Sequence, residues 1–318
     1  MKKNLNRLDK YEYHLDADTD THAWHQDRYP GGSLFEFDTF TFTNCAQVDR
    51  YGPTYTVRSN FYAPLAPTNP WLLDSDLNID NFPSNGGSHG WQEMRVPGDG
   101  PYTLSMAGAS SVGPKAGRGI IVTGTFNVPS NYWSFLIVVG QNDPSFQNST
   151  GGGGASWLAA RTEEGQTIAN SQLIAVAGGG GGQHSPPNST SSIMDARFGE
   201  TGGAGGCGSG GTNGNGGNGC PGSGASGGGG YISAGGSGTY GTGGQGFNTT
   251  LAGGDTSSTN YGGFGGGGGT HGNTAGGGGG GGYSGGGAGH HSSRGGGGAD
   301  SQRENAVIAL EEEKHSYS

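Results

Sequence analysis

The chain has 318 residues, of which 74 are glycine, and it carries a formal net charge of −10. Its 15 Lys and Arg residues are spread along the sequence, whereas nucleic-acid binding needs concentrated positive charge. No apolar run approaches the ~20 residues of a membrane-spanning helix, and no apolar segment follows the basic N-terminus as in a signal peptide. We therefore expect no nucleic-acid partner, no membrane insertion, and assembly in a cytoplasm.

Residues 1–34 are polar and irregular and close at a Pro-Gly-Gly break. We expect them to form an anchoring arm that contacts partner subunits. His22 and His25 lie three residues apart among carboxylates in this arm. Zinc or another divalent ion is therefore kept open as a weaker alternative to a solvated arm.

Residues 35–150 are predicted to form a β-sandwich. In "LFEFDTFTFTN", Phe35, Phe37, Phe40 and Phe42 alternate with polar residues, as in a strand that buries one face. The segments "WQEMRVP", "PYTLSMAG", "GIIVTGTFNVP" and "YWSFLIVVGQ" follow, separated by turn residues and without any helical period. The continuous apolar run at 135–140 is typical of a central strand.

One polar segment in this region, "DSDLNIDN", resembles a calcium loop in its spacing. Its oxygen-bearing side chains alternate, at Asp74, Asp76, Asn78 and Asp80. The segment lacks the glycine at position 6 and the glutamate at position 12 that such loops use. A loop between strands is the favoured interpretation, calcium is the alternative, and no metal or cofactor is predicted.

Residues 151–300 hold most of the glycine, since only 14 of the 74 glycines precede Thr150. Two apolar strands are predicted here, at 156–161 and 171–182. Glycine runs follow at 202–219, 227–230, 262–269, 276–289 and 295–298. Residues 301–318 are predicted to be a closing strand, "NAVIAL" at 305–310, and an acidic tail. Because a strand follows the runs, we expect an insertion anchored at both ends and not a linker.

Glycine runs offer two opposite structures. Composition alone allows disorder, because few side chains can offset the chain entropy. Alternatively, the runs adopt the polyproline II conformation, with three residues per turn and a rise of about 3.1 Å. Without Cβ atoms, such helices approach closely enough to exchange backbone hydrogen bonds. The core would then be a bundle of polyglycine helices.

Motifs for catalysis and for covalent cross-links are sparse. GxGxxG patterns arise by chance in such a sequence, and none lies between a strand and a helix. No P-loop, HExxH motif or hydrolase elbow is found, so we expect no enzymatic activity. Cys45, Cys207 and Cys220 show no CxxC spacing, so free thiols from a reducing compartment are the favoured interpretation, and a Cys207–Cys220 pair or a shared metal is the alternative. Glycosylation motifs at Asn148, Asn188 and Asn248 are expected to be unmodified.

The non-glycine framework resembles a known family over residues 35–310. "FTFTNCAQVDRYGPT", "WQEMRVPGDGPYTLSMAGAS", "GRGIIVTGTFNVPSNYWSFLIVVGQND" and "LIAVAGGGGG" occur in the order found there. This framework resembles the glycine-rich domain of the anaplastic lymphoma kinase and leukocyte tyrosine kinase receptors, with similar domains in bacteria and bacteriophages. The resemblance implies a TNF-like, jelly-roll β-sandwich interrupted by glycine helices, with almost no α-helix. Without a kinase domain or membrane span, receptor signalling does not carry over.

The predicted function is therefore that of a non-enzymatic phage virion protein that binds a receptor on the host surface, a glycan or a protein, at a tail fibre or spike. It would dock to other virion proteins through residues 1–34, act outside the cell as part of the virion, and form a homo-oligomer in one version of the hypothesis. One alternative is a purely structural virion component, such as a capsid decoration, head fibre or tail-tip protein. Another is a bacterial cell-surface or matrix protein.

Recognition is expected in the polar inserts between glycine runs, at 183–200, 231–240 and 247–261. Phe264 and Tyr283, flanked by glycine, are instead expected to fill gaps between runs. Amide, aromatic and basic side chains in or beside these inserts suit surface binding. The candidate recognition residues are His184, Asn188, Arg197, Tyr231, Tyr240, Asn248, Asn260, Tyr261, His290, His291 and Arg294.

Overall fold

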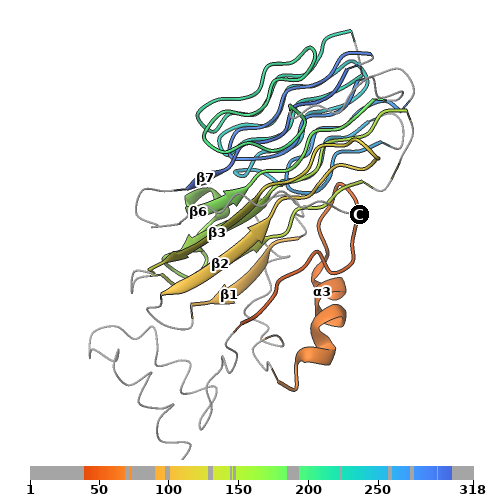
Figure 1. Ribbon diagram of the computed structural model, residues 1–318. Coiled ribbons are helices and arrows are strands. Elements are labelled where there is room, and N and C mark those ends of the chain that lie inside the picture. The colour runs from red at the N-terminus through yellow and green to blue at the C-terminus, as the bar shows by residue number, and fades with distance from the viewer. Residues whose placement is uncertain are drawn as a thin grey trace, which may run out of the picture.

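The computed structural model describes residues 39–68, 72, 90–96, 101–127, 132–143, 145, 148–184, 193–222, 224–256, 260–272, 276–291 and 293–302. Within these residues the fold is all-β, with two antiparallel sheets and a single short α-helix (Figure 1). The prediction of an all-β chain with almost no α-helix is thereby confirmed. The strands are β1 (Gln92–Arg95), β2 (Tyr102–Ala107), β3 (Ile121–Phe126), β4 (Ser134–Val138), β5 (Ser156–Arg161), β6 (Gln172–Ala177) and β7 (Ser301–Gln302).

The larger sheet has the strand order β1-β4-β5-β6-β7, and β2 and β3 form the smaller one. β4 pairs with β1 on one side and β5 on the other, so the apolar run that begins there is an interior strand, as predicted. β5 and β6, from the glycine-rich part of the sequence, belong to this same sheet. β7 pairs with β6, whereas the closing strand predicted at 305–310 lies outside the described residues.

The two sheets pack face to face through a cluster of buried side chains. Phe126 of β3 lies 5.9 Å, centroid to centroid, from Phe135 of β4, and Tyr102 of β2 lies 5.4 Å from Phe135. Met94, Leu158 and Ile174 complete this contact from the larger sheet. The architecture is therefore sandwich-like. The finer TNF-like, jelly-roll topology stays a prediction.

A helix appears where the sequence analysis expected strands only. The helix α3 (Tyr55–Tyr62) begins after Thr54, whose hydroxyl accepts a hydrogen bond from Val57 N–H (3.3 Å), and the 3₁₀ helix η1 (Ala63–Leu65) follows it. Almost no α-helix was expected, and a single short one agrees with that, but the position of this helix was not predicted. Two turns are too few for an apolar period to be recognised; the capping threonine was the available signal.

Residues 39–44, the described part of the first predicted strand, do not form a strand. The alternation of Phe40 and Phe42 nevertheless has the expected effect. Their rings meet edge to face at 4.9 Å, and both pack against the cluster between the sheets. The alternation correctly indicated that Phe40 and Phe42 lie on one buried side of the segment. It did not show whether the segment pairs with another strand.

The glycine-rich segments between residues 150 and 300, here called the glycine lattice, form an ordered array of backbone hydrogen bonds. Gly153 N–H donates to Gly180 O (2.8 Å), Gly179 N–H to Gly281 O (2.8 Å), and Gly281 N–H to Gly153 O (3.0 Å). Three runs distant in sequence thus bond to one another in a ring. The segment is not a linker. Whether each run is a polyproline II helix stays a prediction.

Close approach explains why these positions are glycine. A Cβ atom at Gly280 would overlap the carbonyl oxygen of Gly179, and one at Gly154 would overlap that of Phe264. Both positions lie where a neighbouring backbone passes at hydrogen-bonding distance. Any side chain would push the runs apart and break the array.

The lattice has two distinct ends. The inner end adjoins the strands: Tyr231 N–H donates to Tyr283 O (2.8 Å), and Phe247 N–H donates to Gly230 O (3.0 Å). At the opposite, outer end, Gly206 N–H donates to Arg294 O (3.0 Å) and Thr150 N–H to Gln183 O (3.0 Å). The runs reverse direction at these ends and stack beside one another above the sheets (Figure 1).

Candidate recognition face

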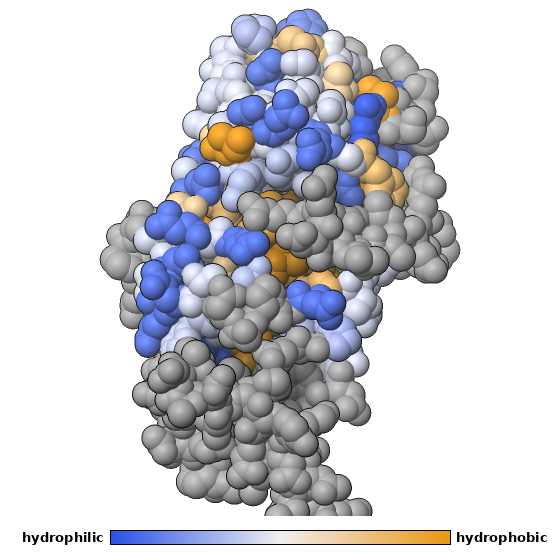
Figure 2. All heavy atoms as spheres, turned by 90° about the vertical axis from the view of Figure 1, so that its left-hand side faces the viewer, coloured by the Kyte–Doolittle hydropathy of each residue, from blue (hydrophilic) through white to orange (hydrophobic). Residues whose placement is uncertain are grey.

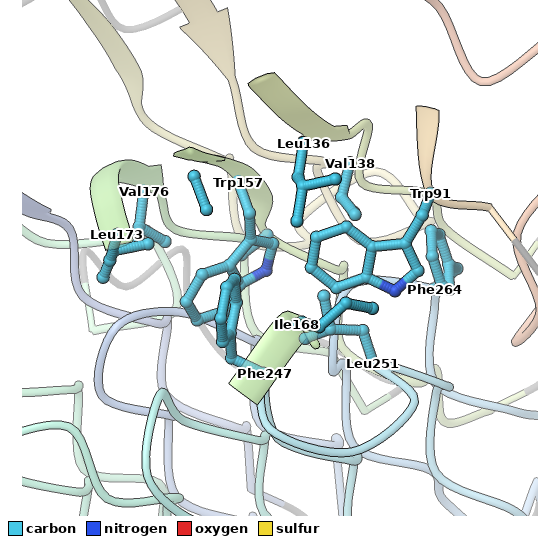
Figure 3. Close-up of a cluster of buried hydrophobic side chains, with 12 residues drawn as sticks. Trp91, Leu136, Val138, Trp157, Ile168, Leu173, Val176, Phe247, Leu251 and Phe264 are labelled. Atoms are coloured by element: carbon cyan, nitrogen blue, oxygen red, sulfur yellow. The ribbon is translucent and has the colours of Figure 1, made fainter. Parts of the chain in front are cut away.

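The inner end of the lattice is anchored to the larger sheet by aromatic side chains. Phe247 is fully buried, 5.2 Å from Trp157 of β5 and 5.4 Å from Trp91, which precedes β1. Leu251 and Phe264, also from inner turns, enter the same cluster (Figure 3). Side chains of these inner turns therefore cover the face of the sheet that the lattice adjoins.

These contacts decide several sequence predictions. Phe264 and Tyr283 fill gaps, as expected: Phe264 is buried and Tyr283 packs against the cluster. Tyr231, a recognition candidate, is half-buried, with its ring 5.2 Å from Phe247 and stacked at 5.9 Å on Tyr283. Expecting the insert 247–261 to be exposed was wrong at Phe247 and Leu251, because apolar side chains at inner turns face the sheet.

The outer turns carry polar side chains that point to solvent. His290 and His291 are exposed at a turn, with ring centroids 4.5 Å apart, which confirms the predicted loop tip. The Ser293 hydroxyl accepts a hydrogen bond from His290 N–H (2.5 Å) and donates one to His290 O (2.8 Å). Tyr240 is 53% exposed, and its ring lies 5.3 Å from that of His271.

His184 joins the same end through backbone pairing. It forms a bridge with Ser149, whose hydroxyl lies 2.7 Å from Nδ1 of the histidine. Ser149 N–H donates to Gly272 O (3.0 Å), next to His271. Residues far apart in the sequence are thus collected at one end. We call this the outer turn face, formed by His184, Tyr240, His271, His290, His291 and Arg294.

Other candidates lie elsewhere. Arg197 and Asn248 are exposed, but they belong to the inner end, where Asp300 N–H donates to Arg197 O (3.0 Å). Asn260 is fully buried, and its Nδ2 donates to Ser149 O. Its proposed recognition role was wrong, because its amide is used inside the protein. Asn188 and the metal candidates lie outside the described residues: Asp74, Asp76, Asn78, Asp80, His22 and His25.

Cys207 and Cys220 form a disulfide, with Cα atoms 5.6 Å apart. The prediction of free thiols was wrong for this pair. Two successive outer turns place the cysteines together, and their sequence separation of 13 residues gave no sign of that. Cys45 is a buried free thiol, and burial raises its pKa. The cross-link ties two turns beside the outer turn face.

Sequence reasoning missed a cluster at the rim of this face. The guanidinium of Arg50 lies 4.9 Å from the ring centroid of Tyr51 and 5.6 Å from that of Tyr261. It also forms an ion pair with Asp255 (2.5 Å). Of the four residues, only Tyr261 was a candidate. Arg50, Tyr51 and Asp255 come from segments more than 200 positions apart, so only tertiary structure brings them together.

Two buried carboxyl groups have perturbed titration. Burial raises the pKa of Asp300, beside β7, to about 6, although its carboxylate accepts a hydrogen bond from Gly199 N–H (2.5 Å). Burial also raises the pKa of Asp143. Asp300 lies at the inner end, and Asp143 lies beneath the rim of the outer turn face. Because both carboxyl groups are buried, we expect their titration to affect the stability of the fold. In the described part of the chain, no group of three His, Cys, Asp or Glu side chains could hold a metal ion.

The surface of the glycine-rich part is mixed in polarity. On the side shown in Figure 2, the upper, glycine-rich part is pale, with polar side chains and small apolar patches scattered over it. Among the described residues, no helix is long and apolar enough to cross a membrane.

In comparisons with known proteins, no family model matches the chain. No curated protein is significantly similar to it.

Proposed function

We propose that this chain is a non-enzymatic bacteriophage virion protein that recognises the host surface at a tail fibre or spike. One observation carries the proposal: the two ends of the glycine lattice differ in chemistry. Aromatic side chains at the inner end are buried against the sheet, whereas histidine, tyrosine, serine and asparagine occupy the outer turns. The outer turn face collects these side chains at one end of the lattice, where they are accessible to a partner.

Rigid scaffolds with polar, aromatic turns are a common way to build recognition surfaces. Tyrosine, serine and asparagine supply stacking area and adaptable hydrogen bonds at a low entropy cost. The hydrogen-bonded lattice supports such a role because it would hold several turns in fixed relative positions, so that little freedom is lost on binding. The resemblance to glycine-rich domains, including phage members with polyglycine helices, points the same way.

The disulfide supports a working environment outside a reducing cytoplasm. Disulfides persist in oxidising compartments and on the surfaces of virions, and Cys207–Cys220 lies next to the outer turn face. The protein would be folded in the host cytoplasm and oxidised after release. Residues 1–34 would dock it to other virion proteins.

The test is attachment of the fluorescently labelled full chain to a panel of bacterial strains. We expect saturable binding to some strains and its loss in the triple variant Tyr240→Ala, His290→Ala, His291→Ala. Ile232→Ala is the matched control, because Ile232 is equally exposed (56%) but lies at the inner end. Attachment that is unchanged in the triple variant would refute recognition through this face.

A second measurement distinguishes the proposed function from the two alternatives, a purely structural virion component and a bacterial cell-surface protein. In particles assembled with the chain lacking residues 1–34, we expect the protein to be absent. Normal incorporation of the wild type with no attachment to any strain would instead favour a purely structural virion component. Failure of the chain to associate with any particle would favour the bacterial cell-surface alternative.

A further inference from the structure

We infer that Arg50, Tyr51, Tyr261 and Asp255 form a subsite for a neutral sugar residue, at the rim of the outer turn face. The inference rests on the proposed function, since it names the class of ligand that such a recognition surface would take. Arg50 and Tyr51 lie outside the inserts in which recognition was expected, and Asp255 lies within the insert 247–261 but was not a named candidate.

The cluster is held in place before any ligand arrives. Arg50 O accepts a hydrogen bond from Gly253 N–H (2.7 Å), and Asp49 O accepts one from Phe264 N–H (2.9 Å). The 49–51 segment is therefore bonded along the side of the lattice. The Arg50 side chain, only 14% exposed, contacts both tyrosine rings. Fixed side chains lose little entropy on binding.

The outward parts of the cluster are those that a sugar uses. Tyr51 is 53% exposed, as is the Asp255 side chain. An aromatic ring presents an apolar face to the C–H groups of a pyranose, while a carboxylate accepts strong hydrogen bonds from its hydroxyls.

Charge selects a neutral ligand. Partial burial of Asp255 acts to raise the pKa of its carboxyl group, but the hydrogen bond from Arg50 acts in the opposite direction, and the pKa lies below its usual range. The carboxylate is therefore ionised at neutral pH. Arg50 is already neutralised by that carboxylate at 2.5 Å, and the whole chain carries −10. The carboxylate of a uronic or sialic acid would be repelled by Asp255. Among these four residues the one cation, Arg50, is already paired with Asp255 and cannot offset that repulsion. A neutral hexose meets no such repulsion.

The test uses ligand-observed NMR on the full chain with methyl β-D-galactopyranoside, methyl α-D-glucopyranoside and methyl β-D-glucuronide. We expect saturation transfer to at least one neutral glycoside and weaker transfer to the glucuronide. Tyr51→Ala should weaken the neutral interaction about tenfold, and Tyr51→Trp, which keeps a ring, should retain it. Phe198→Ala is the control, because Phe198 is a partly exposed aromatic residue (39%) at the inner end.

Three results would overturn the subsite: no transfer to either neutral glycoside, unchanged binding by Tyr51→Ala, or stronger transfer to the glucuronide. These results are distinguishable from failure of the proposed function. If the chain attaches to bacteria but no neutral glycoside binds, recognition stands and the sugar subsite falls. If a glycoside binds at Tyr51 but no strain is bound, the subsite stands and the role in host recognition falls.

Discussion

The ring of Phe247 lies 5.2 Å from the ring of Trp157, and this contact joins a turn of the glycine lattice to strand β5. Both side chains are fully buried. A chain segment with almost no side chains of its own is therefore fastened to a conventional sheet by a few aromatic residues. The first prediction concerns this attachment.

Phe247→Ala should lower the free energy of unfolding by about 3–5 kcal/mol, the usual cost of removing a buried aromatic ring. Tyr240→Ala, which removes a ring at an exposed turn, should change it by less than about 0.5 kcal/mol. Chemical denaturation followed by tryptophan fluorescence measures both, since Trp157 reports directly on the site. Equal effects of the two substitutions on the free energy of unfolding would contradict the packing of the inner end against the sheet.

Gly280→Ala should destabilise the protein by about 3 kcal/mol or more, because the new Cβ would overlap Gly179 O and no flexible side chain there can yield. Gly165→Ala is the matched control. Gly165 has a φ of +74° and open space around it, so its substitution should cost only the about 1–2 kcal/mol of left-handed strain. Thermal unfolding of the two variants distinguishes close approach from glycine flexibility.

Amide hydrogen exchange should show strong protection within the glycine runs. The N–H groups of Gly153, Gly179 and Gly281 donate to neighbouring runs, so exchange requires the lattice to open. We expect rates far below those of a random coil at these positions. Random-coil rates would remove the rigid scaffold on which the recognition proposal depends.

Replacing Cys207 and Cys220 together by serine should lower stability by about 3 kcal/mol, the loop-closure value for a cross-link of this span. Thiol titration of the denatured, non-reduced wild type should find only Cys45 reactive. After reduction, exchange should increase first at the outer turns around residues 206 and 220. Three reactive thiols in protein purified without reductant would contradict the cross-link.

Asp300 should make stability fall as pH rises. Its pKa in the folded protein is about 6, above the ~3.9 of an unfolded aspartate, so the folded state binds the proton more tightly. The contribution is complete below pH ~4 and is lost as pH rises toward and through 6. Asp300→Asn keeps the acceptor for Gly199 N–H and should show a flatter profile in this window. If the stabilities of the two proteins changed in the same way between about pH 4 and about pH 7, the pH dependence could not be assigned to Asp300.

The sequence correctly indicated the strands at Tyr102–Ala107 and Ile121–Phe126, which were predicted as short segments bounded by turn residues. The one segment predicted from alternation, at 34–44, forms no strand in its described part. The interior position of Ser134–Val138 followed from its continuous apolar composition. These predictions succeed because turn residues mark where a short strand begins and ends, and a continuous apolar run marks a strand with neighbours on both sides. The helix at Tyr55–Tyr62 was missed because it is too short to carry an apolar period.

The candidate site was only partly predictable. His290 and His291 were placed at a turn by the glycine runs on either side of them. Asn260 gave no sign that its amide would be used inside the protein, and Arg50 no sign that it would lie between Tyr51 and Tyr261. These relationships depend on which run lies beside which, and neighbouring sequence does not encode that.

By itself, the sequence determined that the protein is all-β and that its glycine-rich part leaves the strands and returns to them. Only the tertiary structure decided the partners of each glycine run, the disulfide, and which turns pack against the sheet and which lie at the outer end. The physical reason lies in glycine itself. A run without side chains has no buried face to set its register, so its neighbours are selected by hydrogen bonds and by the few side chains at its turns.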